Sequence, residues 1–410
     1  MVEYPYIVYC DFEVLLNKVE EQRTNKTFVY QKHIPCGYSI VIVDNENNVI
    51  YKNIFRGKDT AKCFLKDLKE QTEIIMEKQL KIKEMNPLTF EEEQEFLNAE
   101  VCSICKKPFL NKSDNSEFVE IKVKDHDHIT GKYRGASHNS CNINYSMPKK
   151  IPVLFHNLKG YDSHIIIDAL SIHEFSKCEI IPQTFEKYIS FTLNDAKVLD
   201  SYQFMPDSLK NLVNNLNNSN YDFPITKQIF SSVKNLSQNY FKLLIQKQIY
   251  PYEYMDNFDK FEEEKLPSRE EFYSTLNYEQ ISEDDYKHAC KIWNIFQIKN
   301  LGEYHDLYVL LDTCLLADVF QVFRKTILSR YELDPCHFYS APGLAWAAAL
   351  KKTDARLELI TDINMYQFIE NGIRGGICQV SKRFCKANNK YMDNYNDKKE
   401  SKYIAYLDGK

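Results

Sequence analysis

The first apolar run of the chain ends in two carboxylates. Residues 6–10 read Tyr-Ile-Val-Tyr-Cys, and Asp11 and Glu13 follow with one residue between them. Residues two apart on a strand point to the same side of a sheet, so the pattern predicts a buried strand that ends in two neighbouring carboxylates. A divalent cation with oxygen ligands is the usual way to stabilise such a pair. A strand end that runs into solvent is the alternative, and for an isolated pair it is the commoner one.

The pattern after this strand predicts a mixed α/β domain. Apolar runs on either side of the polar residues 44–48 predict a β-hairpin, and Thr89 with Glu92 forms a capping box for a short helix. The Asn-rich residues 211–220 form helices poorly and are predicted to be a loop. The other predicted elements are the hairpin strands 36–43 and 49–55, strands at 151–155, 188–193 and 197–202, and helices over 59–84 and 303–324, with a further helical region from 335 to about 372.

The length of the chain and the distribution of its charges indicate several domains with different surfaces. Its 410 residues favour two or three domains. The net charge of −6 does not indicate a nucleic-acid-binding protein, but residues 101–160 carry ten Lys and Arg against five Asp and Glu. Residues 251–285 carry twelve acidic and three basic residues, which suits one basic working surface and an acidic outer segment.

Twelve scattered cysteines, no secretory leader and no apolar run of about 20 residues predict an intracellular protein with reduced thiols and no membrane partner. The compartment stays open, with the nucleus as one option.

Two cysteine-containing doublets predict a zinc site. Each doublet places two ligands close together, and a tetrahedral Zn²⁺ ion is the usual centre for two such pairs. A small segment without a core of its own is also where a structural metal is useful. The four predicted ligands are Cys102, Cys105, His138 and Cys141.

A second group of polar residues lies inside this segment. Asp125, His126 and Asn142 occur in Asp-His-Asp-His-Ile-Thr-Gly and Cys-Asn, a pattern that resembles the zinc module of recombination endonuclease VII. The resemblance implies that these three residues occupy the metal and base positions of a nicking nuclease. His138 departs from it, because the module has a cysteine there. A zinc-stapled, DNA-contacting insert without nuclease activity is the alternative.

Two later motifs supply more carboxylates. Asn157 and Asp162 follow the apolar strand 151–155. Tyr308 and Asp312 are four residues apart and therefore share one face of a predicted helix. Each motif alone is weak, since a polar turn or an ordinary helix-surface pair would explain it.

Taken in order, the three carboxylate motifs resemble the 3′→5′ proofreading exonuclease of family B DNA polymerases. The resemblance is closest to the protein-primed branch, in the form found in Polinton/Maverick-type mobile elements and related viruses. It spans nearly the whole chain and includes the insert between the first two motifs. The further segments that carry it are residues 155–164, 250–256, 304–308 and 341–346.

The resemblance implies a ribonuclease-H-like α/β exonuclease domain with a small zinc-binding insert, followed by the start of a family B polymerase domain. The expected boundaries are 1–100 and 148–332 for the exonuclease, 101–147 for the insert and 333–410 for the polymerase part. Its cofactors would be Zn²⁺ and a pair of Mg²⁺ or Mn²⁺ ions. Its partners would be DNA, as a single-stranded 3′ end and a primer-template, and a terminal protein that acts as primer.

The resemblance also implies residue roles. Asp11, Glu13, Asp162 and Asp312 would hold magnesium, and Tyr308 would orient the attacking water. Asn157, Ser208 and Leu209 would contact single-stranded DNA, with Asp200 and Ser201 in the same segment. Arg374, Gly375 and Gly376 would contact the template, although Ile373 replaces the tyrosine of that motif.

Asp408 resembles the first metal ligand of the polymerase site, and an Asp-Thr-Asp palm motif does not occur in the sequence. The chain therefore looks like the amino-terminal part of a polymerase. Two alternatives remain at this point: a structure-selective endonuclease that uses His126, and a catalytically inactive DNA-binding remnant of a mobile element.

Overall fold

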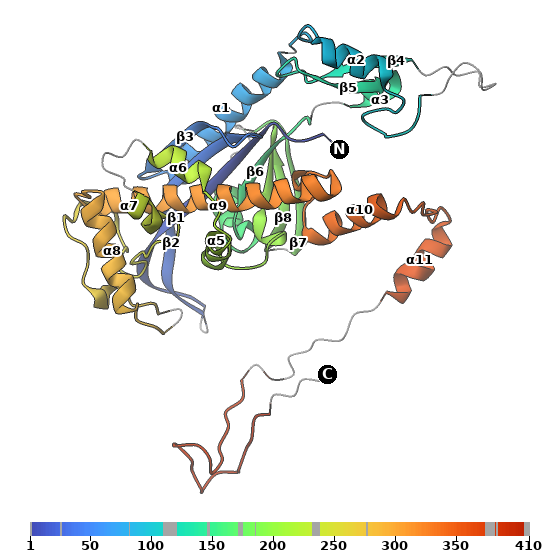
Figure 1. The fold of residues 1–410 in the computed structure, drawn as a ribbon. Helices are drawn as coiled ribbons and strands as arrows, with labels where there is room; N and C mark the ends of the chain where they lie inside the picture. Colours follow the sequence, from blue (N-terminus) through green and yellow to red (C-terminus); the bar gives the residue numbers. More distant parts are fainter. Residues whose placement is uncertain are drawn as a thin grey trace. The chain divides into compact units, whose positions relative to one another are not determined.

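The structure is a computed structural model, and its chain separates into two compact units, Met1–Asp354 and Ala355–Lys410 (Figure 1). Arg374, Gly375, Gly376 and Asp408, which carry predicted DNA and metal contacts, lie outside the described residues. None of the helices in the described part combines the length and apolar character of a membrane span. The structure describes residues 2–24, 27–81, 83–109, 121–145, 148–170, 175–184, 186–231, 238–275, 278–373, 382 and 384–405.

A seven-stranded mixed sheet forms the centre of the first unit. Its strand order is β3-β2-β1-β6-β9-β8-β7, in which β6 pairs in parallel with β1 and β9 and the other pairs are antiparallel. The sheet thus confirms the mixed α/β prediction and the six predicted strands, to which the structure adds β7. Their bounds are β1 Tyr6–Thr24, β2 Thr27–Asp44, β3 Val49–Arg56, β6 Ile151–Phe155, β7 Cys178–Thr184, β8 Lys187–Leu193 and β9 Ala196–Asp200.

Helices cover both faces of the sheet, because alternate residues of the central strands are apolar on both sides. Ile7 and Tyr9 of β1 belong to a core shared with α9, which runs across one face (Figure 1). Val8 and Cys10 belong to a second core shared with α1 and α4 on the other face. The helices of this unit are α1 Thr60–Leu80, α2 Phe90–Asn98, α3 Asn139–Asn144, α4 Asp162–Ala169, α5 Leu209–Asn218, α6 Pro224–Phe230, α7 Gln238–Leu244, α8 Glu283–Ile295, α9 Leu301–Tyr331 and α10 Ala341–Thr353.

Several boundaries differ from the sequence-based prediction. The prediction of a loop for the Asn-rich segment is wrong, because this segment forms α5. The Ser208 side chain accepts a hydrogen bond from the backbone amide of Asn211, and Leu209 and Val213 are buried. This cap and this burial outweigh the low helix propensity of Asn. The capping box at Thr89 is confirmed. β1 and β2 continue as a long hairpin that the apolar pattern did not indicate.

Smaller elements complete the two units. The segment that holds the predicted zinc ligands folds as the strand pair β4 Lys122–His126 and β5 Tyr133–His138, followed by α3. In the second unit, α11 spans Ile363–Gly372, and Asn388 forms an isolated β-bridge with Lys402.

A buried ion pair ties the end of α9 to the start of β1. The Arg324 guanidinium donates to both carboxylate oxygens of Asp334, and its Nη2 lies 2.6 Å from one of them. Nη2 also donates to the Tyr4 carbonyl, and the Tyr4 amide donates to Asp334. Arg324 is 1% and Asp334 0% exposed, so each charge depends on the other.

Replacement of Asp334 by alanine is expected to lower the free energy of unfolding by about 3–5 kcal/mol, because it leaves the buried Arg324 charge with only the partly exposed Glu3 carboxylate, 3.5 Å away, as an ionic partner. Urea denaturation measures the loss. Glu283→Ala is the control, since Glu283 pairs with Lys287 at 2.8 Å in an exposed position and should contribute about 1 kcal/mol or less. Equal losses in the two variants would contradict this account.

Candidate active site and metal centre

Four carboxylates from three separate segments lie near enough to one another to interact electrostatically. Asp11 and Glu13 lie on β1, Asp162 is the first residue of α4, and Asp312 lies in α9. Glu13, Asp162 and Asp312 are buried, and Asp11 is partly exposed. Burial is the main cause of the raised pKa of Asp11. The nearby charges of Asp312, Asp162 and Glu13 raise it further, in that order. The structure therefore brings the carboxylates of all three predicted motifs together.

Asp11, Glu13 and Asp162 hold their protons more tightly than usual. Burial raises the pKa of Glu13 to about 8, with a further contribution from Asp312. Burial also raises the pKa of Asp162 to about 7. Negative charge is thus unfavourable here without a cation.

Lys247 provides a positive charge at this point, in the segment that follows α7. Its Nζ lies 3.3 Å from one oxygen of Asp312, and the Asp312 carboxylate is the main cause of a strongly raised Lys247 pKa. Sequence reasoning missed this residue, because one cation among 52 Lys and Arg residues has no local pattern to mark it.

The second oxygen of Asp312 provides a test of whether a metal fits. Within the described part of the chain, Asp312 Oδ1 is buried and has no hydrogen-bond partner. A buried carboxylate oxygen without a donor is costly unless a cation or a proton satisfies it. Together with three further carboxylates, this oxygen makes a donor set that suits Mg²⁺ or Mn²⁺.

Tyr308 faces the same point from the preceding turn of α9. Its hydroxyl lies 2.7 Å from that of Tyr252, and its ring packs against Tyr250. Burial is the main cause of its strongly raised pKa, and Asp312 adds to it. Tyr308 is therefore a neutral phenol that retains its proton at any physiological pH.

The predicted DNA-contact residues lie near the ends of β6 and β9. Asn157 adopts a left-handed backbone conformation with φ of 68°, and its backbone N–H donates to the Asp200 carboxylate over 2.9 Å. The Ser201 hydroxyl donates to the Phe155 carbonyl. Ser208 caps α5 and Leu209 packs into the core, so both have structural partners whatever they contact in addition.

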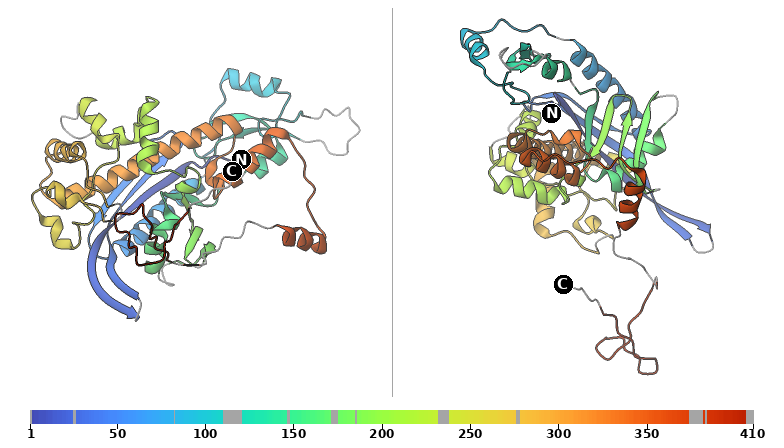
Figure 2. Two further views of the ribbon diagram at one scale, coloured as in Figure 1. Left: turned by 90° about the horizontal axis from the view of Figure 1, so that it is seen from below. Right: turned by 90° about the vertical axis from the view of Figure 1, so that its right-hand side faces the viewer.

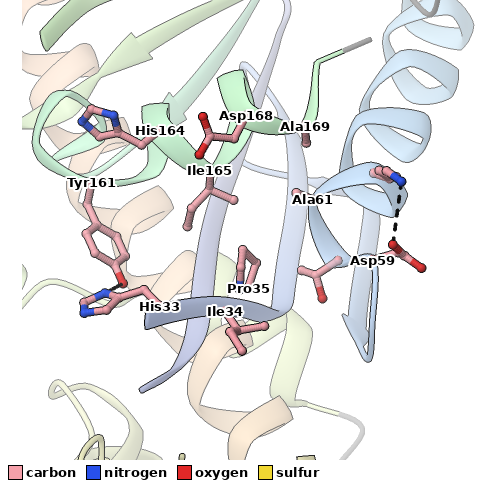
Figure 3. A pocket seen from close by; sticks show the side chains of 12 residues that line it. His33, Ile34, Pro35, Asp59, Ala61, Tyr161, His164, Ile165, Asp168 and Ala169 are labelled. Atoms are coloured by element: carbon pink, nitrogen blue, oxygen red, sulfur yellow. Dashed lines mark hydrogen bonds and ion pairs between the residues drawn. The ribbon is translucent and has the colours of Figure 1, made fainter. Parts of the chain in front are cut away.

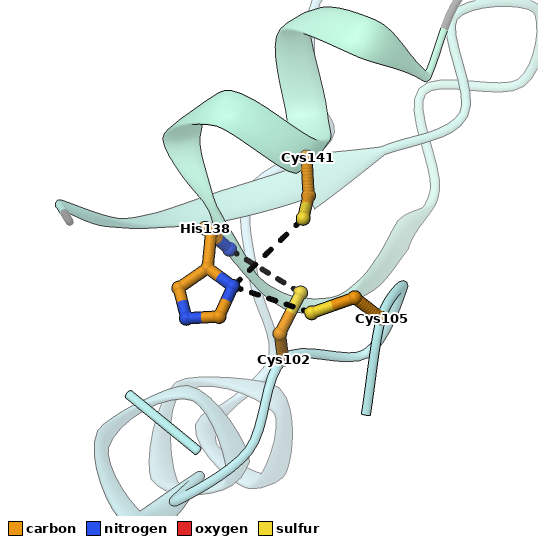
Figure 4. A group of neighbouring side chains, drawn as sticks. All are labelled: Cys102, Cys105, His138 and Cys141. Carbon is orange, nitrogen blue, oxygen red and sulfur yellow. Dashed lines mark hydrogen bonds between the residues drawn. The ribbon is translucent and has the colours of Figure 1, made fainter. Parts of the chain in front are cut away.

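The four predicted zinc ligands form a compact cluster (Figure 4). His138 Nδ1 lies 3.4 Å from Cys105 Sγ and 3.8 Å from Cys141 Sγ, and the His138 amide donates to Cys102 Sγ. The ligand atoms of all four residues lie within 4.8 Å of one another, a spacing that no three carboxylates reach in the described residues. Three cysteine thiolates and one histidine nitrogen form the donor set of a Zn²⁺ site whose four positions are all filled by protein.

The second predicted group in the insert is arranged differently. Arg134 donates to both oxygens of Asp125, over 2.8 and 3.0 Å, and Asp125 is 2% exposed. The His126 ring lies beside that of His128, with centroids 4.9 Å apart. Asn142 lies in α3. The Asp125 carboxylate is thus already paired with a cation from its own hairpin.

Comparison with protein families identifies the chain. Residues 142–394, more than half of the sequence, match the family model described as DNA polymerase type B, organellar and viral. The chain belongs to this family. Comparisons with curated proteins and with solved structures gave no match.

Membership of the type B polymerase family confirms the family that the sequence motifs resemble. It indicates a DNA polymerase that acts in replication, with DNA as partner and divalent metal ions as cofactors. The matched range includes the motifs of Asp162 and Asp312 but not those of Asp11 and Glu13. The Polinton-like origin, the roles of individual residues and the endonuclease alternative stay predictions.

Proposed function

We propose that the first unit is the 3′→5′ proofreading exonuclease of this type B DNA polymerase, with a ribonuclease-H-like fold. The observation that carries the proposal is the proximity of Asp11, Glu13, Asp162 and Asp312, whose charges act on one another, together with the buried Asp312 oxygen that has no hydrogen-bond partner among the described residues. Carboxylates gathered in this way are suited to hold two Mg²⁺ ions. Bound there, the ions would lower the pKa of a water and stabilise the leaving 3′ oxygen of a phosphodiester.

The chain's own groups have distinct tasks in this proposal. Tyr308, which stays protonated, donates a hydrogen bond to a water or phosphate oxygen beside Asp312. Lys247 offsets part of the negative charge at Asp312 and thereby makes the approach of a DNA phosphate less unfavourable. Asn157 contacts the frayed strand, with its loop held in place by Asp200.

The zinc insert has a structural task in the same proposal. We propose that Cys102, Cys105, His138 and Cys141 bind one Zn²⁺ ion that stabilises the short strand pair β4–β5. All four positions would be filled by protein, which is typical of structural rather than catalytic zinc. The pairing of Asp125 with Arg134 supports a DNA-contacting module over the endonuclease alternative.

The products of digestion test this function. A linear single strand should release mononucleotides from its 3′ end when Mg²⁺ is present, and a covalently closed single-stranded circle should stay intact. Linearisation of the circle would indicate the endonuclease alternative instead. Digestion of neither substrate would favour a DNA-binding remnant.

The pKa shifts predict a pH dependence of stability in the metal-free protein. Folded Glu13, with a pKa of about 8, keeps its proton over a range where the unfolded chain has lost it, since the ordinary value is 4.5. The free energy of unfolding should therefore fall as the pH rises from about 5 to 8. Urea denaturation across this range measures the slope.

Two controls sharpen the pH prediction. Glu13→Gln should show a shallower fall, because it removes the titrating group. Added Mg²⁺ should reduce the fall in the unmodified protein, because the ion stabilises the ionised carboxylates. An equal slope in the variant and the unmodified protein would contradict the assignment.

A further inference from the structure

The β1–β2 hairpin extends beyond the part of the sheet that supports the carboxylates. β6 pairs with β1 at Val8 and Tyr9, and β3 pairs with β2 over residues 37–43. Residues 14–24 and 27–35, here called the hairpin, pair with one another outside these ranges. Figure 2 shows the hairpin projecting from the body of the unit. A two-stranded ribbon has little stability by itself, so the part beyond the base depends on its base or on a binding partner.

The register places two exposed aromatic rings on the face that carries the first carboxylates. Asp11, Glu13, Leu15 and Asn17 follow one another on one side of β1, and Asn17 pairs with Lys32. Leu15 is buried and the Asn17 side chain donates to the Asp256 carbonyl, so this side becomes exposed only beyond Asn17. Residues 32, 30 and 28 continue the same side along β2. Tyr30 is 79% and Phe28 67% exposed, so these rings do not contribute to the core.

Contacts at the base of the hairpin link it to the segments around the site. The Leu16 amide donates to the Met255 carbonyl over 2.9 Å. On the other strand, His33 Nδ1 lies 2.6 Å from the hydroxyl of Tyr161, the residue before Asp162 (Figure 3). The base of the hairpin is therefore fixed relative to the carboxylates, and two register shifts, between Lys18 and Glu21 and between Gln22 and Thr24, lie between this base and the hairpin end.

Charge and distance both favour a nucleic-acid strand as the occupant of this face. Among the described side chains of the hairpin, Lys18 and Lys32 are basic and Glu21 is acidic, and Lys32 pairs with Glu21 over 2.8 Å. One positive charge is left in excess, which complements phosphate. Tyr30 is seven residues along β2 from Gly37, the partner of Glu13, or about 23 Å at roughly 3.3 Å per residue. A stacked strand that advances about 3.4 Å per nucleotide covers this distance with six or seven nucleotides.

We propose that Phe28 and Tyr30 form a stacking platform for single-stranded DNA whose 3′ end lies at the carboxylates. Aromatic rings bind bases of any sequence, because every base has a π-face. Such a platform would hold a frayed strand several nucleotides upstream of its end. This inference rests on the proposed exonuclease function for its direction, but the binding that it predicts does not require hydrolysis.

The test is binding of fluorescent oligothymidylates of three to twelve nucleotides without added Mg²⁺, so that a failure of hydrolysis leaves the readout intact. The double variant Phe28→Ala, Tyr30→Ala should bind the twelve-nucleotide strand at least about tenfold more weakly. It should bind the trinucleotide, which is too short to reach the platform, as well as the unmodified chain does.

Two controls separate stacking from a change in the fold. The variant Phe28→Tyr, Tyr30→Phe keeps both rings and should keep the affinity. Tyr278→Ala removes an aromatic ring of similar exposure elsewhere and should also keep it. Equal affinity of the alanine variant for the long strand would overturn the proposal. So would concentration-dependent self-association, seen by sedimentation, that the alanine variant abolishes, because the occupant would then be a second copy of the chain.

Discussion

Replacement of both Asp11 and Glu13 by alanine is expected to lower the rate of mononucleotide release by about three orders of magnitude or more. The two side chains supply half of the carboxylates that would hold the metal ions, and metal ions contribute several kcal/mol to stabilisation of the transition state. The free energy of unfolding should stay the same or rise at neutral pH, because the substitutions remove two acids whose ionised forms are disfavoured by desolvation and by the neighbouring carboxylates. Single-turnover digestion of an end-labelled single strand and urea denaturation measure the two effects.

Glu46→Ala is the matched control for this loss, because Glu46 is an exposed acid in the turn between β2 and β3. Its rate and stability should equal those of the unmodified protein. Undiminished release by the Asp11, Glu13 double variant would show that the carboxylates do not support the hydrolysis. A loss of activity accompanied by unfolding would instead assign them a structural role.

Removal of the zinc ligands is the second change with a large expected effect. Cys102→Ser should abolish binding of one Zn²⁺ per chain and unfold the β4–β5 module, because zinc binding supplies about 10–16 kcal/mol to the folding of small zinc modules. The seven-stranded sheet has its own two cores and should stay folded. Metal analysis gives the zinc content, and limited proteolysis should show new cleavage within residues 101–145.

Cys178→Ser is the control for this experiment, since Cys178 is an exposed cysteine on β7. It should leave the zinc content and the cleavage pattern unchanged. A Cys102→Ser protein that still binds stoichiometric zinc would contradict the assigned ligands. An insert that resists proteolysis after zinc is lost would contradict the structural role of the metal.

Local patterns predicted those parts of the fold that depend on local physics. The strand before Asp11 and the capping box at Thr89 have signals confined to a few residues, and both are confirmed. The Cys102 and Cys141 doublets were predicted to meet from their spacing, and the structure brings them together. The Asn-rich helix α5 was missed because its stability comes from burial of Leu209 and Val213, which depends on the rest of the core.

The candidate site shows the same division. Its carboxylates could be predicted because each lies in a short motif, and because the order of the three motifs resembles that of a known exonuclease. Lys247 could not be predicted, since it reaches Asp312 only through the tertiary fold. The exposed face of the hairpin could not be predicted either, because the alternation of residues along β2 does not show which side faces solvent.

The most direct test of the central claim is the number of divalent ions that the four carboxylates bind. Titration of the zinc-loaded protein with Mn²⁺, followed by the signal of free Mn²⁺ in electron paramagnetic resonance, gives this number without any need for DNA. We expect two saturable sites in the unmodified chain and loss of at least one in the Asp11→Ala, Glu13→Ala variant. Absence of saturable binding, or equal binding by the variant, would contradict the account.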